Sequence, residues 1–187
     1  MSCRDERTIP MVALNGTMAA TLDEFETAVR ETTASTTRTT PNRFDWALAE
    51  SIIEPAVGAR LPFEEVSLAD ANAPVGLDPT REELLTATTG VTGATLGIAS
   101  YGSVVLRMTP DVDELAALFP ERHVVVVREC DVVSDMTMAF AQLAPLFEDE
   151  SADAIIATGP SATADMGELV YGAHGPREVH VIILEEA

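Results

Sequence analysis

Apolar runs alternate with helix-type segments over most of the chain. The apolar runs that read as strands lie at 90–108, 123–129, 153–159 and 178–185. The segments between them with the spacing of amphipathic helices are 80–88, 112–119 and 133–147. Runs that are apolar on both faces are typical of parallel strands covered by helices on both sides. The pattern predicts an α/β fold, a three-layer α/β/α sandwich with a mainly parallel sheet.

The N-terminal part has a different pattern. Residues 21–34 predict an amphipathic helix, with Thr21 as N-cap, Glu24 at the capping-box position and Phe25 on the apolar face. The Thr-rich stretch 35–43 that follows contains Pro41 and predicts a loop. We therefore expect a single domain overall, with a helix and Thr-rich loop at 1–42 and the α/β part at 43–187.

Charge is the strongest signal in the composition. The chain has 31 acidic and 11 basic residues, a formal net charge of −20, and every basic residue is arginine. Without lysine, a P-loop and Schiff-base chemistry are excluded, and so acidic a chain is a poor match for nucleic acid. Either a partner with a basic face or life in molar salt would explain the acidity. Because the acids are spread along the chain, we favour the halophilic interpretation.

Cysteine and histidine usage argues against a metal centre held by this chain. Cys3 and Cys130 lack metal-ligand spacing and the three histidines are scattered, so no iron–sulfur cluster, structural zinc or other metal is expected. The longest apolar runs, at 124–127 and 181–184, are far shorter than a membrane span. The charged N-terminus lacks a signal-peptide stretch. We expect a cytoplasmic protein.

The segment 159–178 concentrates turn-forming and polar residues after a predicted strand. Ligands of parallel sheets lie beyond the carboxyl ends of the strands, so the segment predicts a ligand-facing loop there. Ser161 could cap a short helix whose free N–H groups hold an anion, or the helix could be merely capped. Asp165 could accept bonds from hydroxyls or only satisfy the helix dipole.

Two further side chains of this segment could carry chemistry. His174 could transfer a proton near neutral pH, and the fork of Arg177 matches a carboxylate or phosphate. Alternatively, Arg177 pairs with a surface acid and His174 packs in a turn. The two remaining histidines, His123 and His180, fall in apolar strands and are interpreted as core or edge residues.

Three stretches together resemble the LUD (lactate utilization) domain family, in the branch of its small stand-alone C subunit. They are "GVTGATLGIASYGSVVL" at 90–106, "HVVVV" at 123–127 and "TGPSATADMGELVYGAHGPREVHVIIL" at 158–184. The resemblance covers roughly residues 54–187. It implies a fold similar to sugar-phosphate isomerases and CoA transferases. It also implies a role in L-lactate oxidation to pyruvate, with iron–sulfur clusters in two partner subunits.

Individual residues carry the family pattern. The matching positions are Thr92, Gly93, Gly159, Pro160, Ser161, Thr163, Ala164, Asp165, His174, Gly175, Pro176, Glu178 and His180. One position departs from it: Ser100-Tyr101 stands where many members have an acidic residue followed by threonine. A carboxylate there would suit covalent catalysis of the CoA-transferase type, and a hydroxyl cannot replace it. Ser100 also has no histidine or acid near it in the sequence, so it is a weak nucleophile candidate.

From the resemblance and the residues we predict a cluster-free accessory subunit in lactate utilization. The alternative is a stand-alone enzyme or sensor that binds a phosphorylated sugar, an acyl-CoA or a carboxylate at the strand-end loops. The expected partners are iron–sulfur subunits, a small anionic ligand and a possible second copy. Asp165 and His174 are the catalytic candidates, and whether the chain is an enzyme stays open. The predicted ligand-binding residues are Thr92, Gly93, Ser100, Tyr101, Gly159, Ser161, Thr163, Asp165, His174, Gly175 and Arg177.

Overall fold

The centre of the fold is a sheet of six parallel strands. A computed structural model of the chain describes residues 15–108, 113–148, 153–165, 168–172 and 174–186. The strand order is β1-β12-β7-β4-β2-β3, and every pair is parallel. The bounds are β1 Ser35–Thr39, β2 Ala56–Gly58, β3 Val75–Leu77, β4 Thr89–Gly93, β7 Arg122–Arg128 and β12 Glu178–Leu184. The prediction of an α/β fold with a mainly parallel sheet is confirmed.

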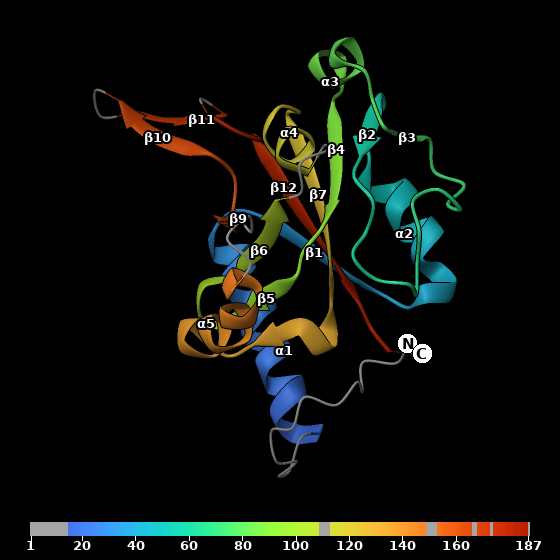
Figure 1. Cartoon of the computed structure of the whole chain (residues 1–187). Coiled ribbons are helices and arrows are strands. Elements are labelled where there is room, and N and C mark those ends of the chain that lie inside the picture. The colour runs from blue at the N-terminus through green and yellow to red at the C-terminus, as the bar shows by residue number, and fades with distance from the viewer. Residues whose placement is uncertain (1–14, 109–112, 149–152, 166–167, 173, 187) are drawn as a thin grey trace.

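Helices flank this sheet (Figure 1). The α-helices are α1 Asn15–Glu31, α2 Phe44–Ser51, α3 Arg81–Thr86, α4 Asp113–Leu118 and α5 Met136–Leu143. Short 3-10 turns are η1 Pro41–Arg43, η2 Ala99–Tyr101, η3 Glu129–Asp131 and η4 Ala144–Glu148. α1 begins six residues before Thr21, and its predicted apolar face, with Phe25 and Val29, is buried.

A second sheet holds strands that we did not expect to leave the parallel sheet. Its order is β8-β5-β6-β9, with bounds β8 Val132–Val133, β5 Leu96–Ile98, β6 Ser103–Met108 and β9 Asp153–Thr158. β6 is antiparallel to both β5 and β9. The reversal between β5 and β6 takes only the η2 turn and Gly102, whose φ of +59° suits glycine. A connection this short can join only antiparallel strands.

The Thr-rich stretch is a strand rather than the predicted loop. Residues 35–39 form β1, which pairs in parallel with the last strand, from Ser35 opposite His180 to Thr39 opposite Leu184. Threonine is β-branched and favours extended backbone. The guanidinium of Arg38 bonds Asp23 at 2.7 Å and Glu26 at 3.0 Å, which ties the strand to α1.

Alternation along the central strands builds a core on each face of the parallel sheet. On β7, Val125 and Val127 pack with α1, β6 and β12, whereas Val124 and Val126 pack with α2 and the segment around Leu68. A third cluster lies between the second sheet and α5. The polypeptide thus forms a layer of α1, α4 and the second sheet on one side and α2 on the other.

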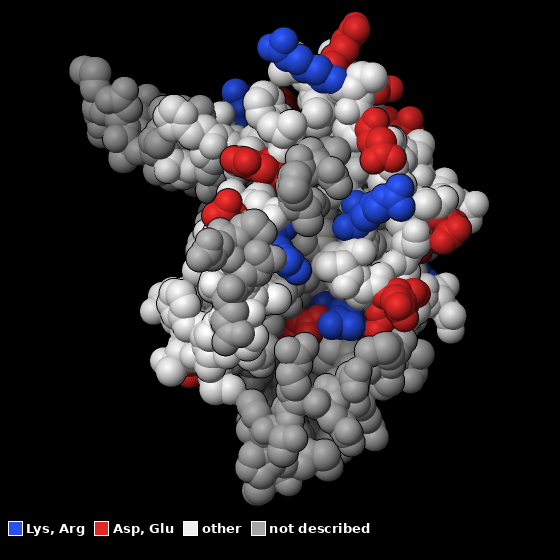
Figure 2. Space-filling model, in the orientation of Figure 1, with Lys and Arg blue, Asp and Glu red and all other residues white. Residues whose placement is uncertain are grey.

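The surface carries its charges in a dispersed way. Figure 2 shows acidic side chains scattered over one face of the molecule, with arginine side chains among them. This agrees with the even spread of acids along the sequence. Among the described residues, none of the helices combines the length and the apolar character that a membrane crossing requires.

Candidate functional site

The polar segment 159–177 lies at the opposite end of the parallel sheet from the one we predicted. It follows β9, which belongs to the second sheet, and leads into the amino end of β12. The backbone N–H of Arg177 donates to the Glu121 carbonyl at 2.7 Å, directly before β7. The segment is therefore anchored at the amino ends of β7 and β12. The prediction of a loop at the carboxyl edge is wrong, because β9 does not run in the parallel sheet.

No helix begins at Ser161. The chain instead forms a two-stranded antiparallel hairpin, β10 Ala162–Asp165 with β11 Glu168–Tyr171, which extends away from the body in Figure 1. The backbone N–H of Ser161 donates to the Pro176 carbonyl at 2.8 Å, and its carbonyl accepts from Gly172 at 2.8 Å. Because these groups are used in the hairpin base, a helix-start anion site at Ser161 is excluded.

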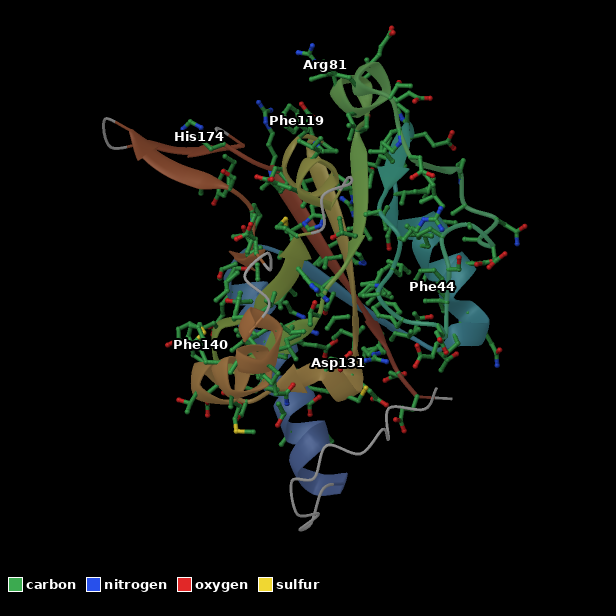
Figure 3. All side chains as sticks on the ribbon, viewed as in Figure 1. Phe44, Arg81, Phe119, Asp131, Phe140 and His174 are labelled. Atoms are coloured by element: carbon green, nitrogen blue, oxygen red, sulfur yellow. The ribbon has the colours of Figure 1, made fainter. Side chains whose placement is uncertain are left out.

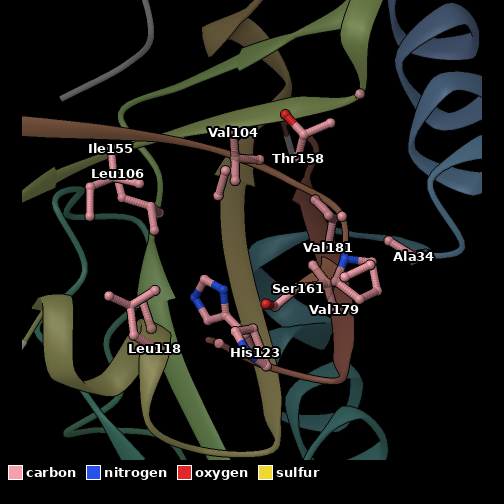
Figure 4. A pocket seen from close by; sticks show the side chains of 18 of the residues that line it. Ala34, Val104, Leu106, Leu118, His123, Ile155, Thr158, Ser161, Val179 and Val181 are labelled. Carbon is pink, nitrogen blue, oxygen red and sulfur yellow. The ribbon is translucent and has the colours of Figure 1, made fainter. Parts of the chain in front are cut away.

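A cavity of about 380 Å³ lies where this segment meets the two sheets (Figure 4). Its walls come from β6 and β9 of the second sheet, β7 and β12 of the parallel sheet, α1, α4 and the polar segment itself. Four of the residues predicted for ligand binding line it, namely Gly159, Ser161, His174 and Gly175. Gly159 has a φ of +61° and lies so close to Thr32 that a Cβ would come within 2.6 Å of it. The end of β9 is thereby fixed at the cavity wall.

His123 is the buried polar side chain of the cavity wall. It lies on β7, is 3% exposed, and its Nε2 is 2.8 Å from the Thr92 hydroxyl on β4. Burial lowers the pKa of His123 to about 4, so the ring is neutral at pH 7. The interpretation of His123 as a core residue is confirmed, but no sequence pattern indicated that it borders a cavity. Thr92 is buried and its hydroxyl bonds His123.

His180 has a similar environment on the other face of the sheet. Its Nδ1 is 2.7 Å from the Ser35 hydroxyl, it is 7% exposed, and its Nε2 has no partner. Burial, and then the charge of Arg122, lowers the pKa of His180 to about 4. This core position agrees with the interpretation made from the sequence.

The titratable side chains in the described cavity wall are histidines. Among the described residues that line it there is no Arg, Asp or Glu, and the titratable side chains are His123 and His174. His174 is exposed and lies beside the hairpin in Figure 3. Arg177, predicted to bind an anion, does not line the cavity and its side chain covers Gly172, where a Cβ would lie 2.2 Å from Cγ. The small anionic ligand stays a prediction. The described cavity wall contains no arginine that could bind it.

The other predicted site residues lie elsewhere. Gly93 ends β4 against Pro62, where a Cβ would lie 2.2 Å from Cδ. Ser100 and Tyr101 are exposed in the η2 turn, next to α1, and do not line the cavity. Thr163 and Asp165 belong to β10, and their side chains lie outside the described residues. The predicted residues therefore do not form one site.

A charged cluster, which no sequence pattern indicated, occupies the carboxyl end of β7. Arg128 bonds Asp131 at 2.5 Å and Glu65 at 3.4 Å, and its guanidinium lies 5.7 Å from the centre of the Phe63 ring. Burial is the largest effect on Asp131 and raises its pKa, although Arg128 opposes it. The Arg128 side chain is thus held between two acids and an aromatic ring, where β7 leads through η3 into β8.

The sequence of this chain matches a known protein family and several of its members. The family model of the LUD domain matches residues 16–184. The chain is similar to lactate utilization protein C of Bacillus licheniformis, with 31% identity over 52% of this chain and 42% of the relative. It is also similar to lactate utilization protein C of Deinococcus radiodurans, with 28% identity over 89% of this chain and 80% of the relative.

The chain spans less than half the length of some of the relatives that it matches. The aligned part spans less than half of the Bacillus licheniformis relative, and 45% of a Macrococcus caseolyticus protein with the same name. A crystal structure of a DUF162 family protein from Deinococcus radiodurans has a TM-score of 0.68 at 20% identity, over 94% of this chain and 99% of that one. This likeness supports the fold. Because the family model covers nearly the whole described chain, the protein belongs to the LUD domain family.

Proposed function

We propose that this chain takes part in L-lactate utilization as a cluster-free subunit, beside partner subunits that carry iron–sulfur clusters and oxidise lactate to pyruvate. The observation that carries the proposal is the LUD match over residues 16–184, together with relatives named lactate utilization protein C. Among these relatives, the Deinococcus radiodurans protein aligns over most of both chains.

The cysteine content of this chain supports the proposal that the iron–sulfur clusters are bound by other subunits. An iron–sulfur cluster is usually held by four cysteine thiolates, and this chain has two cysteines. The electrons released from lactate would therefore pass to clusters on other chains. The segment 159–177 and the cavity beside it would then serve to bind a ligand.

A genetic experiment tests the lactate role. We expect a strain of the source organism without this gene to grow on pyruvate but not on L-lactate, and a plasmid copy to restore growth on lactate. Growth on pyruvate controls for general damage, since pyruvate is the product of the proposed oxidation. Undiminished growth of the deletion strain on L-lactate would contradict the proposal.

The partner claim needs its own measurement. The tagged chain is purified from the source organism in molar KCl, and the co-eluting proteins are identified by mass spectrometry and assayed for iron. We expect cysteine-rich, iron-containing subunits in stoichiometric amount. Elution as an iron-free monomer or homodimer, measured by light scattering, would contradict the partner claim.

A stand-alone enzyme or sensor is the second candidate, and the cavity with His174 in its wall favours it. In this case Asp165 and His174 would act as acid and base. If Asp165→Ala and His174→Ala leave the activity of the purified chain unchanged, this assignment fails. A sensor would be stabilised by its ligand without turning it over.

A further inference from the structure

The cavity between the two sheets is lined on one part by aliphatic side chains, which neither the sequence nor the lactate role explains. Its walls include Val104 and Leu106 of β6, Ala117 of α4, Ile155 of β9 and Val181 of β12. We propose that it binds an uncharged, mainly apolar small molecule with one hydrogen-bonding end group. This ligand is additional to lactate, and the inference does not depend on the lactate role.

Size distinguishes this ligand from lactate. The cavity volume is about 380 Å³, at the lower end of the roughly 300–1,000 Å³ that ligand pockets occupy. An apolar cavity of about 150 Å³ is large enough to hold benzene. L-Lactate has the same number of non-hydrogen atoms as benzene and would leave more than half of the volume unfilled. By the same ratio about fifteen non-hydrogen atoms would fill the volume, so a chain or ring of about eight carbons fills more of it than lactate does.

Charge distinguishes it from an anion. The described lining residues include no arginine, and the histidine that is buried in the wall, His123, already bonds Thr92. An anion moved from water into such a site loses hydration without gaining a cation. A phosphate or a small carboxylate is therefore disfavoured inside the cavity.

The polar groups of the wall suit one neutral end group. Figure 4 shows the ring of His123 and the side chain of Ser161 on one side of the cavity, and Val104, Leu106 and Ile155 on the other. A serine hydroxyl can both donate and accept a hydrogen bond. The hydroxyl of Thr158 is already shared with Ser103 at 2.7 Å. Ser161 is thus the side chain best placed to meet an alcohol or a carbonyl of the ligand.

Thermal unfolding of the purified full chain in molar KCl at pH 8 tests the ligand class. The probes are 1-octanol, octanoate, L-lactate and inorganic phosphate, each titrated separately. We expect 1-octanol to raise Tm in a saturable way, octanoate to need at least tenfold higher concentration, and lactate and phosphate to have no effect. A saturable rise with phosphate or lactate, or none with 1-octanol, would overturn the proposal.

A matched pair of variants tests the location. Ala157 lines the cavity, whereas Ala154, on the same strand β9, packs in the cluster beneath α5. Ala157→Leu fills part of the cavity and should weaken 1-octanol binding at least tenfold. Ala154→Leu makes the same change outside the cavity and should leave binding unchanged. Equal affinity of both variants for 1-octanol would mean that the ligand does not bind in this cavity.

A measurement on the unaltered protein covers the case in which Ala157→Leu does not fold. NMR cross-relaxation should connect the 1-octanol chain with methyl groups of Leu106 and Val181, which line the cavity. It should not reach Ile156, which is 41% exposed and is not among the lining residues. Contacts with Ile156 alone would mean surface adsorption, and the proposal would be wrong.

Discussion

Acidification should weaken the fold through His123, the histidine buried in the cavity wall. Burial lowers its pKa from 6.5 to about 4, because a charged ring would lose its hydration inside the protein. The unfolded chain therefore takes up a proton near pH 6.5, while the folded chain does so only near pH 4. The stability that neutral His123 contributes is complete above about pH 6.5 and is lost as the pH falls towards 4.

The expected loss follows from the difference between these two pKa values. A difference of about 2.5, at about 1.4 kcal/mol for each pH unit, amounts to at most about 3.5 kcal/mol. At pH 5 nearly all unfolded His123 is protonated and little of the folded form is, so about 2 kcal/mol is lost between pH 7 and pH 5. This is a large share of the roughly 5–15 kcal/mol that stabilises a typical domain.

Urea unfolding of the wild type and of His123→Gln, at pH 7 and pH 5 in the same molar KCl, measures this loss. The glutamine amide can replace Nε2 as the hydrogen-bonding partner of Thr92 but cannot titrate. Carboxylates and His180 titrate in both proteins, so their contributions cancel. We expect the wild type to lose about 2 kcal/mol more than His123→Gln between the two pH values.

A refuting result completes the experiment. An equal loss in the wild type and in His123→Gln would refute the reasoning. It would mean that His123 is protonated as easily in the folded chain as in the unfolded one.

Three further predictions concern the fold and its solvent. Gly102→Ala should lower the free energy of unfolding by at least about 1 kcal/mol, since the φ of Gly102 is +59° and a Cβ would lie 2.4 Å from the backbone nitrogen of Val29. Gly76→Ala is the control, because a Cβ at Gly76 would lie 3.6 Å from the nearest described atom. Thr80→Ala should lower it by about 1 kcal/mol through loss of the α3 capping box, whereas Thr86→Ala at the far end of that helix should cost less. Circular dichroism should show loss of structure in dilute buffer and recovery in molar KCl, because salt screens the net charge of −20.

Each of these three has a result that would contradict it. Urea midpoints of Gly102→Ala and Gly76→Ala that shift equally would mean that the left-handed turn is not constrained. An unfolding free energy of Thr80→Ala equal to that of the wild type would mean that the cap carries no stability. A spectrum that does not change with salt would remove the halophilic interpretation.

Local sequence pattern was enough to predict the parallel core. The run Val124 to Val127 is apolar on both faces, short and β-branched, which favours a strand covered on both sides, as β7 is. Helices α3, α4 and α5 were predicted from spacing within about four positions of their bounds, whereas α1 begins six residues before its predicted start. The motif at 158–184 predicted the family. These features depend on neighbours a few residues apart, which the sequence displays directly.

Only the tertiary structure decided where the strand ends meet. The Thr-rich stretch 35–39 is a strand because it pairs with β12, about 145 residues away. β9 lies in the second sheet because it pairs with β6, and this moved the segment after it to the amino end of the parallel sheet. The cavity and the bond between Thr92 and His123 follow from that placement. Periodicity indicates which side of a segment is apolar. It does not indicate which other strand accepts and donates the segment's backbone hydrogen bonds, because that strand can lie far away in the sequence.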